Sequence, residues 1–127
     1  MITLSQAVTL TKTLGHLGRL RIVSLLESGP LSVCQMAAAL DMPLSTLSGH
    51  LLELRRADLV CEQRKSKWVY YHLNDVDTIA AVLAPVLAAI TDDPIARRDA
   101  GRVAALQGKA MAAVCDGVTS KARLPRP

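Results

Sequence analysis

The sequence predicts a mainly α-helical protein with one small β-hairpin. Half of its 127 residues are hydrophobic, yet it contains one Trp, two Tyr and no Phe. The apolar residues are therefore mostly Leu, Ala, Val and Ile, of which Leu and Ala are strong helix formers. The three aromatic residues lie together within residues 68–71, a composition that favours a strand. The length is that of one domain.

Four helices are expected in the first half of the chain, because apolar residues recur there every three or four positions. Gly29 and Pro30 end the second helix, and Ser32 is a favoured N-cap for the third. A three-residue turn at 41–43, which contains a proline, separates the third helix from the fourth. The expected helices span residues 4–14, 15–28, 33–40 and 44–57.

Beyond Asp58 the apolar spacing changes to that of a hairpin. The runs LVCEQ and WVYYHL, residues 59–63 and 68–73, are rich in Val, Trp and Tyr and are typical of strands. The polar residues RKSK lie between these runs and predict the hairpin tip.

The carboxyl-terminal third returns to a helical pattern. We expect one helix over residues 75–91, kinked or broken at Pro85, and an Ala-rich helix over 95–115. The final stretch has no apolar periodicity and ends in prolines. We therefore expect residues 1–117 to form a single domain and residues 118–127 to be a disordered tail.

Two short helices followed by a basic hairpin form the plan of a winged helix-turn-helix domain. In the fourth helix a stripe of four leucines would anchor one face to the core. The opposite face is then free to enter the major groove of DNA, where short hydroxyl side chains suit phosphates and base edges. The residues expected to bind DNA are Ser45, Thr46, Ser48, Gly49, His50 and Arg56 in the helix and Arg64, Lys65 and Lys67 at the hairpin tip.

The charge distribution fits a polyanionic partner. The formal net charge is +4. Residues 1–74 hold 8 Lys and Arg against 5 Asp and Glu, which gives +3, whereas residues 75–127 hold 7 against 6, which gives +1. The excess therefore lies with the expected DNA-binding elements. Taken alone, the cations of the hairpin tip are equally typical of a solvated charged surface.

The stretch from Gly18 to Leu73 resembles the ArsR/SmtB family of winged-helix bacterial repressors. The residues that carry the resemblance are RLRIVSLLESGPLSVCQMAAALDMPLSTLSGHLLELRRADLV and then RKSKWVYYHLN. The family similarly has an RLRIL-like second helix, an STVSRHL-like recognition helix and a WVYYRL-like strand. Gly49 departs from this pattern, which often has Arg or another large polar residue there. Three interpretations stay open: a missing base contact, a close approach of the backbone to DNA, or a neutral change.

In arsenic-responsive members of the family, an LCVCDLC-like motif at the start of the third helix binds trivalent arsenic or antimony. The matching stretch here is LSVCQMA, in which Cys34 takes the place of the middle cysteine. Arsenic(III) favours two or three thiolates, so Cys61 and Cys115 are the candidate partners. We expect Cys34 to approach Cys61 on the hairpin, and Cys115 to join if the last helix, of the same subunit or of its partner, folds back over this region. The alternative is that the cysteines are small buried hydrophobic residues.

Zinc-responsive members carry Asp and His ligands on the helix after the hairpin. Asp75 and Asp77 match the start of that pattern, but the three histidines are His16, His50 and His72 and none follows. We therefore expect no zinc site of this type.

The resemblance implies a cytoplasmic homodimer that binds double-stranded operator DNA and releases it when arsenite or antimonite binds. The first helix and the Ala-rich terminal helices are the expected dimer interface. Three cysteines without a short-spaced pair fit free thiols, and short apolar runs predict no membrane segment. Two alternatives stay open: a redox or reactive-sulfur sensor on the same scaffold, and a winged-helix module for protein contacts. No catalytic motif indicates an enzyme.

Overall fold

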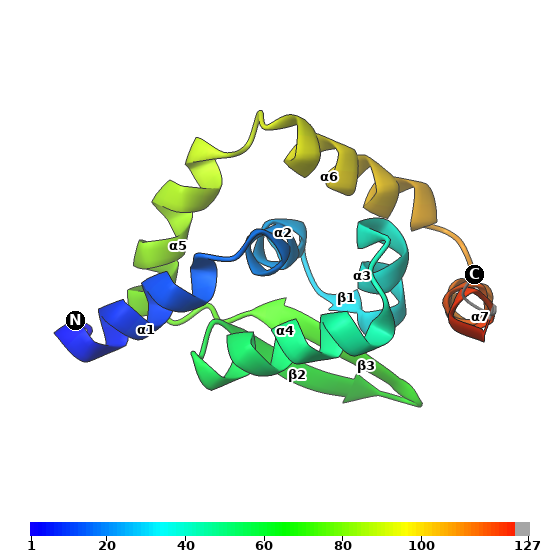
Figure 1. The fold of residues 1–127 in the computed structure, drawn as a ribbon, viewed down its shortest axis with the longest axis horizontal. Helices are drawn as coiled ribbons and strands as arrows, with labels where there is room; N and C mark the ends of the chain where they lie inside the picture. Colours follow the sequence, from blue (N-terminus) through cyan, green and yellow to red (C-terminus); the bar gives the residue numbers. More distant parts are fainter. Residues whose placement is uncertain (124–127) are drawn as a thin grey trace.

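The computed structural model describes residues 1–123, which form seven helices and a three-stranded sheet. Helix α2 lies at the centre, with α5 and α6 arching over one side and α4 and the sheet on the other (Figure 1). Helix α7 lies beside α3 at the edge of the molecule. The elements in chain order are α1 (Leu4–Leu14), α2 (Leu17–Leu26), β1 (Leu31–Ser32), α3 (Val33–Leu40), α4 (Leu44–Arg56), β2 (Val60–Lys65), β3 (Trp68–Leu73), α5 (Asp77–Ala89), α6 (Pro94–Leu106) and α7 (Met111–Arg123).

Side-chain caps fix where several helices begin. Thr3 and Ser32 each form a capping box with the Gln three residues later, so that α1 and α3 start where their sequences predict. Asp93 accepts hydrogen bonds from the amides of Ile95 and Ala96, and Pro94 opens α6. Each cap provides acceptors for amides that have no partner within the helix.

The core is aliphatic and joins the helix-turn-helix to the rest of the domain. Ile22 and Val23 of α2, Met36 of α3, and Leu47 and Leu54 of α4 are all fully buried. Each such side chain contributes about 1.5–3 kcal/mol through removal of its apolar surface from water. This packing confirms the leucine stripe of α4 as its anchoring face.

The sheet has the strand order β1–β3–β2, and both pairs are antiparallel. Leu31 and Ser32 lie opposite Tyr71 and Tyr70, whereas Cys61 of β2 lies opposite His72. The segment before α3 therefore pairs with β3 and not with β2. Adjacent strands are about 4.8 Å apart, so β3 separates β1 from β2 by about twice that distance.

The carboxyl-terminal region differs from its sequence-based expectation in three ways. The expected helix 95–115 is two helices, because Gly108, with φ +85°, lies in the break that follows Leu106. Pro85 does not end α5, which continues to Ala89. Helix α7 runs to Arg123, so residues 118–123 of the expected tail are helical; residues 124–127 lie outside the described residues.

An ion pair joins α6 to the centre of the fold. The carboxylate of Asp99 accepts hydrogen bonds from Nε and Nη2 of Arg21 at 2.9 and 3.0 Å, and Nη2 also donates to the Leu40 carbonyl. The side chain of Asp99 is 2 % exposed. Hydrogen bonding to Asp99 raises the pKa of Arg21, which keeps the guanidinium charged. One buried contact thus connects α6, α2 and the end of α3.

Within the described residues, no single helix is long and apolar enough to cross a membrane. Helices α5 and α6 taken together are long and apolar enough, but they are bent by 104° relative to each other.

Candidate nucleic-acid interface and cysteine pair

Helix α4 presents a polar face away from the core. Ser45, Thr46, Ser48 and Gly49 are exposed, while Leu47, Leu51 and Leu54 are buried. The separation follows from the helical period, because anchoring one stripe leaves the opposite residues free. The exposed face also includes Leu52, at 45 % relative exposure, which sequence reasoning did not select. An apolar group at this place suits the methyl group of thymine.

Gly49 lies at the middle of this exposed face. A Cβ built at this position would meet no atom within 4 Å. Packing within the subunit therefore places no demand on a glycine here. The open space agrees both with a close approach of DNA to the backbone and with a neutral change.

The end of α4 is connected to the sheet by charged side chains. Arg55 pairs with Glu62 of β2, and Glu62 also accepts a hydrogen bond from the Tyr71 hydroxyl at 3.3 Å. Burial, together with the charge of Glu62, raises the pKa of Tyr71. Arg56, an expected DNA contact, pairs with Glu53 at 3.2 Å on the exposed surface. This exposed pair is weak and leaves Arg56 able to exchange its partner for a phosphate.

The tip of the β2–β3 hairpin is a cluster of three exposed cations. The turn is tight, with Ser66 at φ +57° between Lys65 and Lys67. Lys65 Nζ lies 5.6 Å from the Tyr70 ring centroid, and Lys67 Nζ lies 4.9 Å from that of Trp68. The aromatic rings thus support the cations, worth about 0.5–1 kcal/mol each at exposed sites. Among the described residues, no ion pair within the salt-bridge distance includes Arg64, Lys65 or Lys67.

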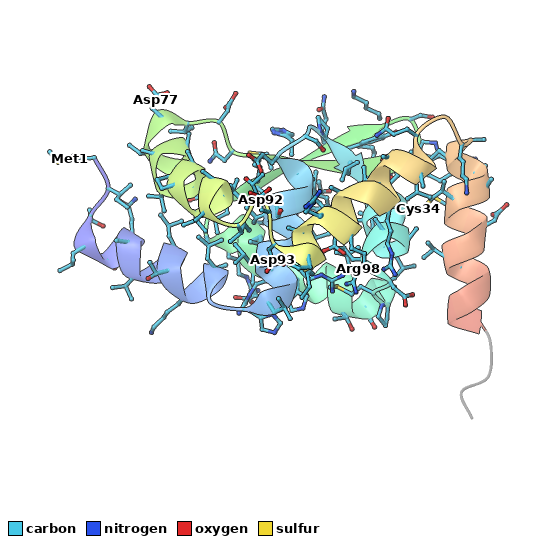
Figure 2. All side chains as sticks on the ribbon, turned by 90° about the horizontal axis from the view of Figure 1, so that it is seen from above. Met1, Cys34, Asp77, Asp92, Asp93 and Arg98 are labelled. Atoms are coloured by element: carbon cyan, nitrogen blue, oxygen red, sulfur yellow. A yellow bond between two sulfur atoms is a disulfide. The ribbon has the colours of Figure 1, made fainter. Side chains whose placement is uncertain are left out.

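Cys34 and Cys115 form a disulfide between the start of α3 and α7, with their Cα atoms 5.0 Å apart. Figure 2 shows Cys34 on the side of the molecule next to α7. The expected approach of Cys34 to Cys61 is not observed, because β3 lies between β1 and β2. Cys61 is a free, half-buried thiol on β2. Within the described part of the chain, no three His, Cys, Asp or Glu residues gather as a metal site, so the three cysteines do not meet in one subunit.

Comparison with known proteins agrees with this geometry. Residues 17–61 match the model of the family described as "Bacterial regulatory protein, arsR family". The biofilm growth-associated repressor of Agrobacterium fabrum is 37% identical over 86 residues, which cover 68% of this chain and 72% of that protein. The chain belongs to the arsR family. The matched segment begins at α2 and ends in β2, and therefore contains the whole helix-turn-helix.

Two further arsR-family comparisons extend the similarity. The arsenical resistance operon repressor of Escherichia coli K12 is 41% identical over 68 residues, 53% of this chain, and the match spans 58% of that relative. A solved structure from Mycobacterium bovis, described as a homodimeric winged helix-turn-helix DNA-binding domain, has a TM-score of 0.62 and 30% identity. That similarity covers 72% of this chain and 83% of the M. bovis chain. The fold is therefore a winged helix-turn-helix, with β2 and β3 as its wing.

The wing cations provide a test of DNA contact. The double variant Arg64→Ala and Lys67→Ala should weaken binding to every duplex and reduce the slope of log K against log salt by about 2, one unit for each lost phosphate contact. Titration of labelled DNA at 50–200 mM salt measures this slope. Arg97→Ala is the matched control, because Arg97 is exposed and its helix, α6, lies on the side of α2 away from the wing (Figure 1). An unchanged slope in the double variant would exclude the wing from the interface.

Proposed function

We propose that this arsR-family chain is a cytoplasmic transcriptional repressor that binds operator DNA as a homodimer. The observation that carries the proposal is the exposed polar face of α4 together with the three exposed cations of the wing. In this arrangement α4 enters the major groove while the wing contacts the neighbouring backbone. Similarity to two proteins described as repressors supports the direction of regulation.

Dimer formation is supported by an apolar surface on α1. Leu4 and Val8 share one face of this helix and are 85 % and 46 % exposed. A single recognition helix contacts few base pairs, whereas a two-fold dimer contacts two half-sites about 34 Å apart or a multiple of that distance. The M. bovis structure is described as homodimeric, which supports the same assembly here.

We further propose that the Cys34–Cys115 pair is the sensor. Cys34 is the second residue of α3, the first helix of the helix-turn-helix. A groove of about 920 Å³ lies between α3, the turn before α4 and helix α7, and Pro43, Ser45 and Val118 contribute to its walls. The disulfide therefore holds α7 beside the start of the recognition helix. We expect this fixed α7 to oppose docking of α4, so that the disulfide form binds DNA more weakly than the dithiol form.

A peroxide is the first candidate effector, because the two thiols are placed to form a disulfide. One thiolate attacks the peroxide to give a sulfenic acid, and the second thiol displaces its oxygen as water. In total, two thiols and one hydrogen peroxide give one disulfide and two waters. A small-molecule persulfide can oxidise the same pair: it transfers its outer sulfur to one thiol and leaves as a thiol, and the second protein thiol then displaces that sulfur as hydrogen sulfide.

Arsenite is the second candidate, favoured by the 41% identity to an arsenical resistance operon repressor. In the reduced protein the two thiols would each displace one hydroxyl group of arsenous acid. The arsenic is then bound by two thiolates and keeps one hydroxyl group, and two water molecules are released. Antimonite would follow the same chemistry. Two thiolates are the minimum set for such a site, and Cys61 lies on another part of the fold.

The sensor is tested by titrating the protein into labelled DNA from the region upstream of its gene and measuring binding. The reduced protein should bind, and peroxide or arsenite should weaken binding about 5–150-fold, the range of typical allosteric coupling. Cys34→Ser and Cys115→Ser should remove the response, whereas Cys61→Ser should keep it. Mass spectrometry separates a disulfide, which loses two hydrogens, from an arsenic adduct.

Each negative result has a distinct meaning. Equal affinity of the reduced, oxidised and arsenite-treated protein would refute the sensor and leave the repressor. An absence of DNA binding in all three states would refute the repressor and favour a winged-helix module for protein contacts.

A further inference from the structure

His50 of the recognition helix lies against the start of α2. Its ring centroid is 4.6 Å from that of His16, and the two rings are tilted by 50°. His16 is the N-cap of α2, and its Nδ1 accepts a hydrogen bond from the Gly18 amide at 3.0 Å. Because Nδ1 is an acceptor, the neutral ring carries its proton on Nε2. The Nε2–H group of His16 is therefore a donor available to an outside acceptor.

Gly18 makes this approach of the two helices sterically allowed. A Cβ at Gly18 would lie 2.9 Å from His50 Nε2 and 3.3 Å from His16 Cε1. The shorter distance is below the contact that real side chains tolerate. A side chain at position 18 would thus displace the His50 ring from the start of α2.

A third basic residue, Arg19, follows His16 by three positions in the first turn of α2. The Nε atom of Arg19 is buried and has no hydrogen-bond partner among the described residues. Burial lowers the pKa of His50, and the neighbouring His16 and Arg19 lower it further. These are the groups that bear on His50 from α2, and no carboxylate among them opposes their effect. His16, Arg19 and His50 are therefore three nitrogen-bearing side chains with no anion among the groups that bear on His50.

We propose that His16, Arg19 and His50 form a clamp for one backbone phosphate of DNA, and that phosphate binding adds one proton to His50. The clamp rests on the proposed DNA-binding function and extends that surface from α4 and the wing to α2. Arg19 supplies a permanent charge, His16 donates from Nε2, and protonated His50 donates a charge-assisted hydrogen bond. A phosphate fits better than a base edge, because all three groups donate and a phosphate has only acceptors.

Proton uptake makes DNA affinity depend on pH. In the free protein His50 is mostly neutral at pH 7, whereas a bound phosphate favours its charged form. DNA affinity therefore rises as the pH falls through the pKa of His50 in the complex. It levels off below the pKa of His50 in the free protein, which is lower. Because one proton is taken up, the DNA affinity can change by at most tenfold per pH unit. We expect about tenfold tighter binding at pH 6 than at pH 8.

Titration of the upstream DNA and of a random duplex at pH 6, 7 and 8, at constant ionic strength, tests the clamp. His50→Gln should bind both duplexes with little dependence on pH, and Arg19→Gln should lose about one unit of salt slope. His16→Asn keeps the helix cap but loses the Nε2–H donor, so it should weaken both duplexes several-fold. His72→Gln is the matched control and should behave as the parent protein, because His72 lies opposite Cys61 at the base of the hairpin, away from the cationic tip.

Three results would overturn the clamp. The first is a pH dependence in His50→Gln equal to that of the parent. The second is a loss confined to the upstream DNA, which would place His50 on a base edge. The third is an unchanged salt slope in Arg19→Gln. Failure of the parent protein to bind either duplex at any pH would instead refute the proposed function, and the clamp with it. Circular dichroism at each pH confirms that the variants are folded.

Discussion

Replacing Asp99 with alanine should lower the free energy of unfolding by about 3–5 kcal/mol, the usual cost of removing one partner of a buried ion pair. Asp99 is 2 % exposed and Arg21 is 17 % exposed, so water can solvate the remaining guanidinium only in part. Arg21 would keep its hydrogen bond to the Leu40 carbonyl but lose both bonds to the carboxylate. Arg98, at 3.6 Å from Asp99, is half exposed and contributes little.

Urea unfolding at pH 7, followed by circular dichroism, measures this loss. Asp92→Ala is the matched control, because Asp92 is an exposed aspartate in the loop before α6, and it should change stability by less than about 0.5 kcal/mol. The double variant Arg21→Met and Asp99→Leu should recover much of the loss, since apolar side chains of similar volume replace a buried pair with little cost. A loss below about 1 kcal/mol in Asp99→Ala would show that the pair does not hold α6 to the core.

The helix-turn-helix is predicted well from sequence because local rules determine it. Helix α1 spans the predicted residues, and Ser32 caps α3 through a bond to the amide three residues later. The exposed residues of α4 follow from the positions of its leucines alone. The two wing strands follow from the cluster of Val, Trp and Tyr around a polar tip. In each case the information lies within about ten residues.

The parts that were predicted only incompletely depend on contacts between distant segments. Strand β1 is two residues long and exists because β3 offers it a free edge. Cys34 and Cys115 are 81 residues apart, and their meeting requires the break after α6 that turns α7 back onto α3. The sequence indicates Cys115 as a candidate partner of Cys34 only on the condition that the last helix folds back, and no local pattern predicts that fold. Packing between α3 and α7, not periodicity, selects such a pair.

The contact between α2 and His50 was missed for the same reason. His16 is the N-cap of α2, and its contact with His50 joins segments 34 residues apart. A signal was present in the sequence: Gly18 interrupts the first turn of a helix, where a glycine weakens the helix unless another group needs the space. The space is taken by His50.

Reduction of the Cys34–Cys115 disulfide should lower the free energy of unfolding by about 4 kcal/mol. The bond closes a loop of 81 residues, and the chain entropy that it removes from the unfolded state increases with the logarithm of that length. Urea unfolding with and without a thiol reductant measures the difference. Cys115→Ser should match the reduced parent under both conditions, and Cys61→Ser, which leaves the bond intact, should match the parent.

The m-value, which is the slope of the unfolding free energy against urea concentration, indicates whether α7 separates from the domain after reduction. The buried residues among the described side chains of α7 are Val114, at 6 % exposed, and Cys115, at 8 % exposed, and both lie at the disulfide. If reduction releases α7, the m-value falls, because less surface is left to expose on unfolding. A released α7 is also what the sensor requires, since the dithiol form must free the start of α4. A reduced protein with the same midpoint and m-value as the oxidised one would contradict both the stability prediction and this route from Cys34 to the recognition helix.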